Sequence, residues 1–383
     1  MSCSWLLRPL TVWLRDPNVA GTTLFPERAA WVSADDPAVA GWDVQVAGHL
    51  CVDLVPRLLD AADVTPGGLI QVGPLDLRLG GCVGNTGPDL AALGLRTLLV
   101  TSLGDDVLAG TVAALIDAVP AADERVEIVP GATTSYSVVV QPPGTDRTFW
   151  HHVGANASFD GRRVDVGAAP MLHVGYLPLL PRLTERAGVG LVRLFEEARS
   201  ASVTTSMDMC VVQPGRSTVD WADLLTRVLP LCDVVSPSLD DMRSALAHPG
   251  LEAAEAAEWL LERGAAVVAV SDGARGLVVR TAEAPRFAGA KGRWSALLAA
   301  LPESWHHRQV EVPATPVPVV QTTGAGDAAT AALLASLHSG GSLDQGLELV
   351  QSAAAHRVAG RGSLAALHGR GQPTSLQAAS DEG

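Results

Sequence analysis

The stretch VVQTTGAGDAATAALLASLHSGG, from Val319 to Gly341, decides how the rest of the chain is interpreted. Gly324 and Gly326 flank an alanine, an aspartate follows, and a run of helix-forming residues begins. Glycines let the backbone approach a ligand closely, and the free N–H groups at a helix start favour an anion. The stretch therefore predicts a helix that begins beside an anion-binding loop, with Asp327 in its first turn.

A simpler interpretation of this stretch exists, because the helix dipole favours an acidic residue in the first turn of any helix. A second glycine-rich element, LGGCVGNTGPDLAALGLRTLLVTSLGDD, changes the balance. In it, Gly80 and Gly81 precede a loop that ends at Asn85, and Gly94 and Gly104 follow ten residues apart. Two independent elements of this kind favour a functional role for Asp327.

The composition restricts the classes of protein that fit. The chain has 383 residues, of which 48% are hydrophobic and 18% charged, so we expect a globular protein. Its formal charge of −14 argues against a nucleic-acid polymer as a partner. The five cysteines contain no C-x-x-C pair, so we expect neither a disulfide framework nor a zinc site, and a reducing cytoplasm fits best.

Two further features bear on location. Arg8 and Pro9 interrupt the apolar N-terminal stretch, which lacks the continuous apolar core of a signal peptide. No stretch reaches the roughly 20 apolar residues of a membrane span. We therefore expect no membrane association.

Strand-like and helix-like segments alternate from Trp42 onward, which predicts a mainly parallel sheet with helices on both faces. The segment TTSYSVVVQPPGTDRTFWHHVGAN breaks this alternation, since two strand-like runs flank a PPGTD turn. We interpret that segment as a β-hairpin.

The two glycine-rich elements resemble those of the ribokinase-like (PfkB) family of carbohydrate and nucleoside kinases. That family carries G-G-x-x-x-N, then a glycine, nine residues and another glycine, and later D-T-x-G-A-G-D. Both patterns occur here in the same order, and the resemblance runs from Asp43 to Leu367. It implies a three-layer α/β/α fold with a mainly parallel central sheet and a small β-sheet lid.

The resemblance also implies a division of the chain. Residues 43–370 would form the kinase domain, with lid strands near 68–79 and 133–153 and an insertion near 285–307. Residues 1–42 would be an extension packed on the body, and residues 371–383 a frayed tail.

Three shorter pieces agree with the resemblance. GHLCVD is similar to the first-strand motif whose aspartate, here Asp53, grips substrate hydroxyls. DRTFWHHVGAN resembles the lid hairpin and the loop that ends at Asn156, and SDGARG resembles the nucleotide loop. Each piece alone has an ordinary interpretation as a turn.

The resemblance implies an ATP-dependent phosphotransferase that uses Mg²⁺ and acts on a hydroxyl of a sugar or sugar-like molecule. Asp327 would be the general base, and the amides of Gly324, Ala325 and Gly326 would bind the charge of the transferring phosphate. The expected substrate-binding residues are Asp53, Gly80, Gly81, Asn85, Arg147 and Asn156. The expected nucleotide-binding residues are Ser271, Gly273, Gly276, Thr322 and Ser238.

Two positions depart from the family pattern. Ser238 to Asp241 align with the N-x-x-E motif that organises Mg²⁺ and phosphate, so Asp241 would hold the metal through a water. Gln321 stands where the signature usually begins with Asp, which in many members belongs to a monovalent-cation site. Because Gln321 offers only a neutral carbonyl oxygen, we expect weak or absent activation by K⁺.

Two alternatives to a sugar kinase remain open. A nucleoside kinase would need aromatic side chains near the lid to sandwich a base, and Phe149 and Trp150 could supply them. A degenerate kinase that only binds a sugar or nucleotide is favoured by Gln321 and Ser238, while the intact Asp327 argues against it. The resemblance is also compatible with a homodimer formed through the lid.

Overall fold

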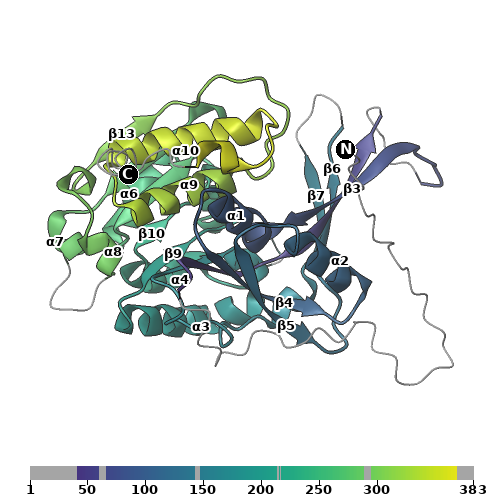
Figure 1. Cartoon of the computed structure of the whole chain (residues 1–383), viewed down its shortest axis with the longest axis horizontal. Coiled ribbons are helices and arrows are strands. Elements are labelled where there is room, and N and C mark those ends of the chain that lie inside the picture. Colours follow the sequence, from purple (N-terminus) through teal and green to yellow (C-terminus); the bar gives the residue numbers. More distant parts are fainter. Residues whose placement is uncertain are drawn as a thin grey trace, which may run out of the picture. The chain divides into compact units, whose positions relative to one another are not determined.

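The fold is known from a computed structural model, drawn in Figure 1. The structure describes residues 41–59, 66–142, 147–213, 215, 217–288 and 295–368. All of these belong to one compact unit, residues 40–383. Most of the expected N-terminal extension and the whole of the expected tail lie outside the described residues, as does the hairpin turn.

The described residues contain a large sheet of nine strands, in which seven successive strands are parallel. The two strands at one edge, β12 and β13, run antiparallel. In spatial order the strands are β13 (Gln309–Val312), β12 (Leu277–Thr281), β11 (Val267–Ser271), β10 (Val234–Val235), β9 (Thr204–Met207), β8 (Met171–Gly175), β1 (Val44–Gly48), β4 (Thr97–Gly104) and β5 (Ala122–Val129). The mainly parallel sheet expected from the sequence is thus confirmed.

Both faces of this sheet are buried. Successive residues of a strand point to opposite faces, and Val46 belongs to one apolar cluster while Ala47 belongs to another. Val267 and Val268 divide between the same two clusters. Parallel strands covered on both faces read as continuous apolar runs, which explains their clear appearance in the sequence.

Helices cover the two faces (Figure 1). Residues of α1, α2, α9 and α10 contribute to one cluster, and residues of α3, α4, α5 and α6 to the other. The helices are α1 (Gly81–Ala92), α2 (Val107–Ile116), α3 (Pro181–Ser200), α4 (Trp221–Val228), α5 (Leu239–Ala245), α6 (Ala253–Glu262), α7 (Ala284–Ala288), α8 (Ala296–Ala299), α9 (Ala325–Ser339) and α10 (Leu343–Val358). None of them is both long and apolar enough to cross a bilayer, within the part of the chain that the structure describes.

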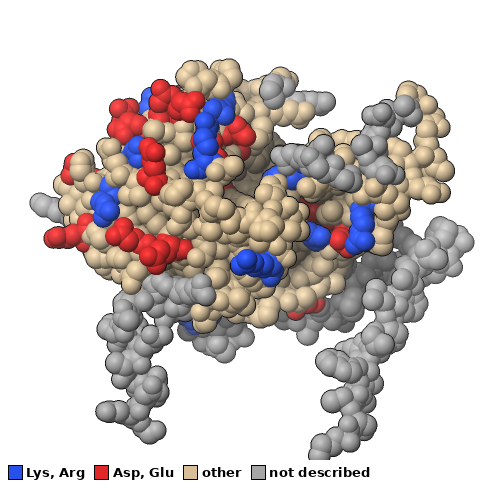
Figure 2. All heavy atoms as spheres, turned by 90° about the horizontal axis from the view of Figure 1, so that it is seen from above, with Lys and Arg blue, Asp and Glu red and all other residues tan. Residues whose placement is uncertain are grey.

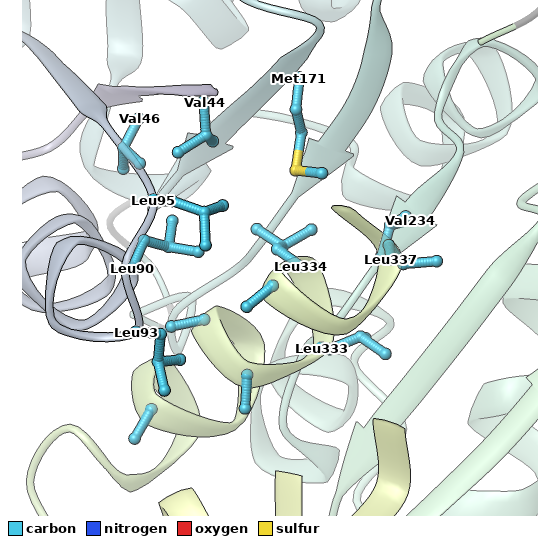
Figure 3. Packing of buried hydrophobic residues seen from close by; sticks show 14 of the residues in the cluster. Val44, Val46, Leu90, Leu93, Leu95, Met171, Val234, Leu333, Leu334 and Leu337 are labelled. Carbon is cyan, nitrogen blue, oxygen red and sulfur yellow. The ribbon is translucent and has the colours of Figure 1, made fainter. Parts of the chain in front are cut away.

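The helix that begins at the glycine-rich loop lies at the centre of one layer. Figure 3 shows Leu333, Leu334 and Leu337 of α9 beside Met171 and Val234 of the sheet. Burying each leucine side chain stabilises the fold by about 1.5–3 kcal/mol. This packing fixes where the first turn of α9, and therefore Asp327, lies.

A second, smaller sheet has the strand order β3-β2-β6-β7. Its strands are β2 (Cys51–Leu58), β3 (Val72–Gly80), β6 (Tyr136–Val140) and β7 (Thr148–His152). β6 and β7 pair antiparallel, which confirms the expected hairpin. The small sheet expected beside the large one is also present.

β1 ends at Gly48, and after His49 and Leu50 the chain enters β2, where Asp53 pairs with Arg78 on one side and Ser137 on the other. One local expectation was wrong. The segment up to Asn85 is helical rather than a loop, since α1 begins at Gly81. Tertiary packing of α1 against α9 and the sheet outweighs the weak helix propensity of this glycine-rich segment.

Candidate active site

The candidate site lies where the parallel strands of the large sheet end. His49, Tyr176 and Asp208 directly follow the carboxyl ends of β1, β8 and β9, and Ser271 is the last residue of β11. Carboxyl ends of parallel strands meet at one edge of a sheet, which is where α/β proteins bind their ligands. The topology therefore brings together residues that are more than 200 positions apart in the sequence.

Asp327 lies at this edge in the first turn of α9 and is only 4% exposed. Tyr176 donates its phenol hydroxyl to both carboxylate oxygens, at 2.8 Å and 2.7 Å. Thr86 Oγ1 donates to Oδ1 at 3.0 Å, and Asn85 Nδ2 donates to Oδ2 at 3.1 Å. Neutral donors from α1 and from the end of β8 thus hold the carboxylate in one orientation.

The pKa of Asp327 reflects two opposing causes. Burial raises this pKa, and the hydrogen bonds from Tyr176 and Thr86 lower it, so that it stands at about 6. Burial and the neighbouring Asp327 charge raise the pKa of Tyr176 well above its ordinary value. Tyr176 therefore stays protonated and remains a donor, while Asp327 is mainly ionised at neutral pH.

The loop before α9 has the conformation that its glycines permit. Gly324 has φ of +76°, in the left-handed region that favours glycine, and it caps the helix. A Cβ at this position would lie 3.9 Å from Asp327 Oδ2, so the loop is next to the carboxylate. No atom lies within 4 Å of the Cβ position of Gly326. The amide of Ala325 donates to the Thr322 carbonyl oxygen at 3.3 Å.

Asp53 lies on the inner face of the small sheet and is buried. A Cβ on Gly80 would lie 2.4 Å from Asp53 Oδ1, and a Cβ on Gly81 would lie 2.3 Å from His49 Nδ1. Both glycines are therefore required by the side chains packed on them. The first two positions of the G-G-x-x-x-N element place α1 against the small sheet.

The inner face also carries two histidines. Burial lowers the pKa of His49 well below its ordinary value, and the neighbouring His151 lowers it further. Burial lowers the pKa of His151 to about 4, with a smaller effect from His152. Both rings are neutral at physiological pH, and they meet edge to face with centroids 5.0 Å apart.

The small sheet touches the glycine-rich loop through two arginines. Arg147, in the segment before β7, is hydrogen-bonded to Thr322 Oγ1. Arg78 of β3 donates to Gln321 Oε1 at 3.5 Å. The structure thus places Arg147 beside the anion loop, and it gives the neutral carbonyl oxygen of Gln321 a cationic neighbour.

Asn156 has a different environment from the other expected substrate residues. It is fully buried, and its Nδ2 donates to the Leu50 carbonyl oxygen at 2.7 Å. Its Oδ1 accepts from the Leu50 amide and from Thr101 Oγ1, both at 3.4 Å. These contacts hold the connection between β1 and β2 in place.

Four of the five expected nucleotide-binding residues lie at or just after the ends of β10 and β11, whereas Thr322 lies in the loop before α9. Ser238 and Ser271 form a parallel bridge between these segments. Gly276 has φ of +105°, and a Cβ there would lie 2.1 Å from the Val312 carbonyl oxygen. Gly273, with φ of +52°, has no atom within 4 Å of its Cβ position. This part of SDGARG therefore has open space beside it.

Asp208 and Asp241 form an acidic group near Asp327. Asp241 Oδ2 accepts from the Ser238 amide at 2.8 Å and completes a capping box at the start of α5. Burial raises the pKa of Asp208 well above its ordinary value, and the charges of Asp241 and Asp327 raise it further. Buried carboxylates that repel one another are a donor set that suits a hard divalent cation such as Mg²⁺.

A buried ion pair lies near Asp327. Arg357 of α10 pairs with Asp89 of α1. Burial raises the pKa of Asp89 to about 7, the Arg357 charge opposes this rise, and the Asp327 charge adds to it. The Arg357 charge also lowers the pKa of Asp327.

Sequence reasoning missed Tyr176, Thr86 and Asp208. Asp208 directly follows β9, but three of the four residues of this strand are Thr or Ser, so no apolar run in the sequence marks the strand end. Thr86 lies next to Asn85 but has no place in the motif, and Tyr176 follows its strand without any distinctive spacing.

The charged residues on one face of the molecule are intermixed. Figure 2 shows acidic and basic side chains next to one another there, with no continuous basic field among the described residues in view. A continuous basic surface is what binding to a nucleic-acid backbone requires.

Several solved structures have a similar fold. The PfkB protein from Polaromonas sp. JS666 is 19% identical, with a TM-score of 0.63 over 85% of this chain and 99% of that one. Arabidopsis thaliana ribokinase complexed with ribose and ATP is 19% identical, with a TM-score of 0.62 over 86% and 96%. Adenosine kinase from Sinorhizobium meliloti is 21% identical, with a TM-score of 0.63 over 88% and 99%.

At such identities the structural likeness shows the fold alone. The family itself is shown by the match of residues 43–368 to the model of the pfkB family of carbohydrate kinases. That match spans most of the chain and includes both glycine-rich elements. The chain therefore belongs to the pfkB family of carbohydrate kinases.

Proposed function

We propose that this protein transfers the terminal phosphoryl group of ATP to a hydroxyl group of a sugar or sugar-like molecule. The observation that carries this proposal is Asp327, a buried carboxylate at a helix start that neutral donors orient beside an open glycine loop. Phosphoryl transfer needs positioning and charge stabilisation more than covalent chemistry, and this arrangement supplies both.

Asp327 is the general base of the proposed reaction. With a pKa of about 6 it is ionised at neutral pH and still basic enough to take a proton from an attacking hydroxyl. Tyr176, Thr86 and Asn85 fix the carboxylate before the substrate arrives, so little reorganisation is needed in the transition state.

The amides of Gly324, Ala325 and Gly326 stabilise the charge on the transferring phosphate, and the Ala325 amide exchanges its 3.3 Å contact with the Thr322 carbonyl oxygen for the phosphate. They begin α9, where the helix dipole favours negative charge. Arg147 adds a positive charge through its contact with Thr322. Because Arg147 belongs to the small sheet's hairpin, this charge reaches the loop only while the small sheet covers the site.

ATP lies along the ends of β10 and β11 in this proposal. Ser238, Ser271, Gly273, Gly276 and Thr322 bind the nucleotide. Mg²⁺, held by Asp208 and by Asp241 through a water, would neutralise charge on the phosphate oxygens.

The acceptor substrate lies against the inner face of the small sheet. Asp53 and Asn85 bind its hydroxyl groups, and Gly80 and Gly81 let Asp53 and His49 pack closely on the start of α1. Asn156 supports this pocket by fixing Leu50 rather than by touching the substrate. The neutral histidines and the carboxylate of Asp53 suit the hydroxyl groups of a polyol, and Arg78, opposite Asp53 in β3, adds a positive charge on this face.

The experiment that tests the proposal is a coupled ADP-release screen over sugars, sugar acids and nucleosides. We expect substrate-dependent ADP release with at least one uncharged sugar. Asp327→Asn serves as the control, because it keeps the shape of the side chain and removes the base. ATP turnover at the wild-type rate in this variant would contradict the base assignment, and nucleotide binding without any turnover in the wild type would favour a binding-only protein.

A nucleoside kinase is the second candidate, and Phe149 is the observation that favours it. Phe149 lies two residues before His151 in β7, so both side chains point to the inner face. Phe149 is 42% exposed and could stack on a base. Trp150 points to the opposite face, so it cannot stack on the other side of the same base. Phe149→Ala should raise KM for a nucleoside and leave KM for a sugar unchanged.

We further propose that the outer face of the small sheet joins two copies of the chain. Leu77, Leu54, Val138 and Trp150 lie side by side across the four strands. Trp150 is 54% exposed and Leu77 is 42% exposed. Apolar faces of this kind mark contact surfaces. A dimeric mass that becomes monomeric in Trp150→Lys would support the proposal, and a monomeric wild type would contradict it.

A further inference from the structure

The inner face of the small sheet holds a cluster of three side chains that carry soft or borderline metal ligands. His49, Cys51 and His151 each offer one ligand atom, and these atoms lie within 4.8 Å of one another. Cys51 opens β2 and His151 belongs to β7, so the cluster exists only because β6 joins these strands in one sheet. The spacing of these residues in the sequence gives no sign of it.

The hydrogen bonds determine which ring nitrogen of His49 carries the proton. Ser135 Oγ donates its proton to the His152 carbonyl oxygen at 2.8 Å. It can therefore only accept from His49 Nε2, which lies 3.3 Å away. His49 Nδ1 is then the nitrogen with the free electron pair, and it is buried without a hydrogen-bond partner.

The same reasoning applies to His151. Cys51 Sγ donates its proton to Asp53 Oδ1, so the Ser137 hydroxyl, 3.6 Å from this sulfur, is the donor in that contact. Ser137 Oγ therefore accepts from His151 Nδ1, at 3.0 Å. His151 Nε2 carries the free electron pair and is also buried without a partner. Two bare imidazole nitrogens thus share one buried face, and such unsatisfied atoms call for an explanation.

Neighbouring residues add a fourth ligand and orient the two histidine rings. Cys51 Sγ donates to Asp53 Oδ1 at 3.3 Å, so a carboxylate stands ready as a fourth ligand or as an outer partner. Ser135 and Ser137 orient the two rings through their other nitrogens. The backbone of Gly81 packs against His49 Nδ1, because a Cβ there would lie 2.3 Å from this atom, and this contact fixes the ring.

We propose that His49, Cys51 and His151, with Asp53, form a binding site for a borderline divalent cation of the zinc class, which competes with the acceptor substrate. A tetrahedral zinc ion holds its nitrogen and sulfur ligands about 3.3–3.6 Å apart, so side-chain movements of about 1 Å close the site. The thiol releases its proton to solvent as sulfur binds the metal. The thiolate and the Asp53 carboxylate then balance the two positive charges.

The spacing of the cysteines in the sequence predicts no zinc site, and the proposed site departs from that expectation. It is also distinct from the Asp208 and Asp241 group, whose oxygen ligands suit Mg²⁺. Competition with the acceptor rests on the proposed function, since Asp53 is the residue that both would use. Metal binding itself does not rest on it.

Cobalt is the probe that tests the site, because Co²⁺ bound to a thiolate gives a charge-transfer band that oxygen ligands do not give. The reduced, EDTA-treated chain with Cys3→Ser is titrated with Co²⁺ in excess Mg²⁺. We expect one Co²⁺ per chain with this band, and Zn²⁺ should displace it. Cys51→Ser should abolish the band, and His151→Ala should weaken Co²⁺ binding at least tenfold.

The matched control is Cys210→Ser, since Cys210 is the thiol near Asp208 and Asp241. This variant should keep the band. The proposal is overturned if the parent chain shows no band, or if the band survives Cys51→Ser. A parent without the band in which His151→Ala raises KM for a sugar would assign the bare nitrogens to substrate hydroxyls instead.

A second arm measures ADP release at several Zn²⁺ concentrations. Zn²⁺ should raise KM for the acceptor without changing kcat, and Cys51→Ser should remove this inhibition. Unchanged kinetics with an intact cobalt band would overturn the competition alone. The cobalt titration needs no turnover, so the failure of the metal site and the failure of the proposed function are distinguishable.

Discussion

The two sheets of this protein differ in how far their faces are buried. The large sheet is buried on both faces, and its side chains in β1, β8 and β11 are almost entirely apolar. The small sheet exposes most of β3, and it divides its residues into an apolar outer face and a polar inner face. The large sheet therefore supplies the core, and in the function proposed above the small sheet is the surface that contacts the acceptor substrate.

The functional carboxylates follow this division. Asp327 depends on the large sheet, because α9 packs on it and Tyr176 extends from β8. Asp53 belongs to the small sheet and has polar and titratable neighbours there. We infer that the first sheet determines the chemistry and the second determines which molecule undergoes it. The predictions below test this separation, from the largest expected effect to the smallest.

Replacing each carboxylate by its amide separates catalysis from recognition. Asp327→Asn should lower kcat by about 10²–10⁴-fold, the usual contribution of general-base catalysis. Asp53→Asn should mainly raise KM for the acceptor, by roughly 10–100-fold, because it weakens hydrogen bonds to a charged group worth about 1.5–3 kcal/mol. Steady-state kinetics would show the difference. An equal loss of kcat in both variants would contradict the separation of catalysis from recognition.

A matched pair of leucine truncations compares the stability that each sheet supplies. Leu334→Ala removes a fully buried side chain of α9 and should lower the free energy of unfolding by about 2–5 kcal/mol. Leu77→Ala removes a side chain that is 42% exposed on the small sheet, and it should change this free energy by less than about 0.5 kcal/mol in the monomer. Urea unfolding measures both. A loss for Leu77→Ala as large as that for Leu334→Ala would show that the small sheet is part of the core.

The phenol of Tyr176 should control the pH dependence of the reaction. Its hydrogen bonds lower the pKa of Asp327, so Tyr176→Phe should raise this pKa above about 6. A general base works only when ionised, so the acidic limb of kcat/KM should move to higher pH. The activity should fall severalfold near pH 6 and much less near pH 8.

The chain offers a matched control for this substitution, since Tyr136 is its other tyrosine. Tyr136 lies on β6 against the ring of His152, away from Asp327. Tyr136→Phe should leave the pH profile unchanged. If Tyr176→Phe lowers the activity equally at all pH values, Tyr176 has only a structural role.

The smallest effect concerns K⁺. Gln321 presents a neutral carbonyl oxygen that accepts from Arg78, and a positive guanidinium beside this position disfavours a cation. Replacing K⁺ by a bulky organic cation in the assay should therefore change kcat by less than about twofold. A large stimulation by K⁺ would show that the loop forms a cation site in spite of Gln321 and Arg78.

What the sequence by itself determined is the architecture and the place of Asp327 in the first turn of α9. Buried parallel strands appear as continuous apolar runs, and Gly81 and Gly324 mark backbone positions with positive φ, which other residues adopt only with strain. These are local signals, because each depends on neighbouring residues. The hairpin of β6 and β7 could be predicted for the same reason, because its two strands and its turn follow one another in the sequence.

Only the tertiary structure decided the partners of Asp327 and the composition of the inner face. Tyr176 and Asp208 are single polar residues at strand ends, and the order of strands in space makes them neighbours. His49, Cys51 and His151 meet because β2, β6 and β7 pair in one register, which aligns Asp53 with Ser137 and Ser137 with His151. A contact of this kind depends on strand pairing between distant segments, and no local pattern in the sequence records it.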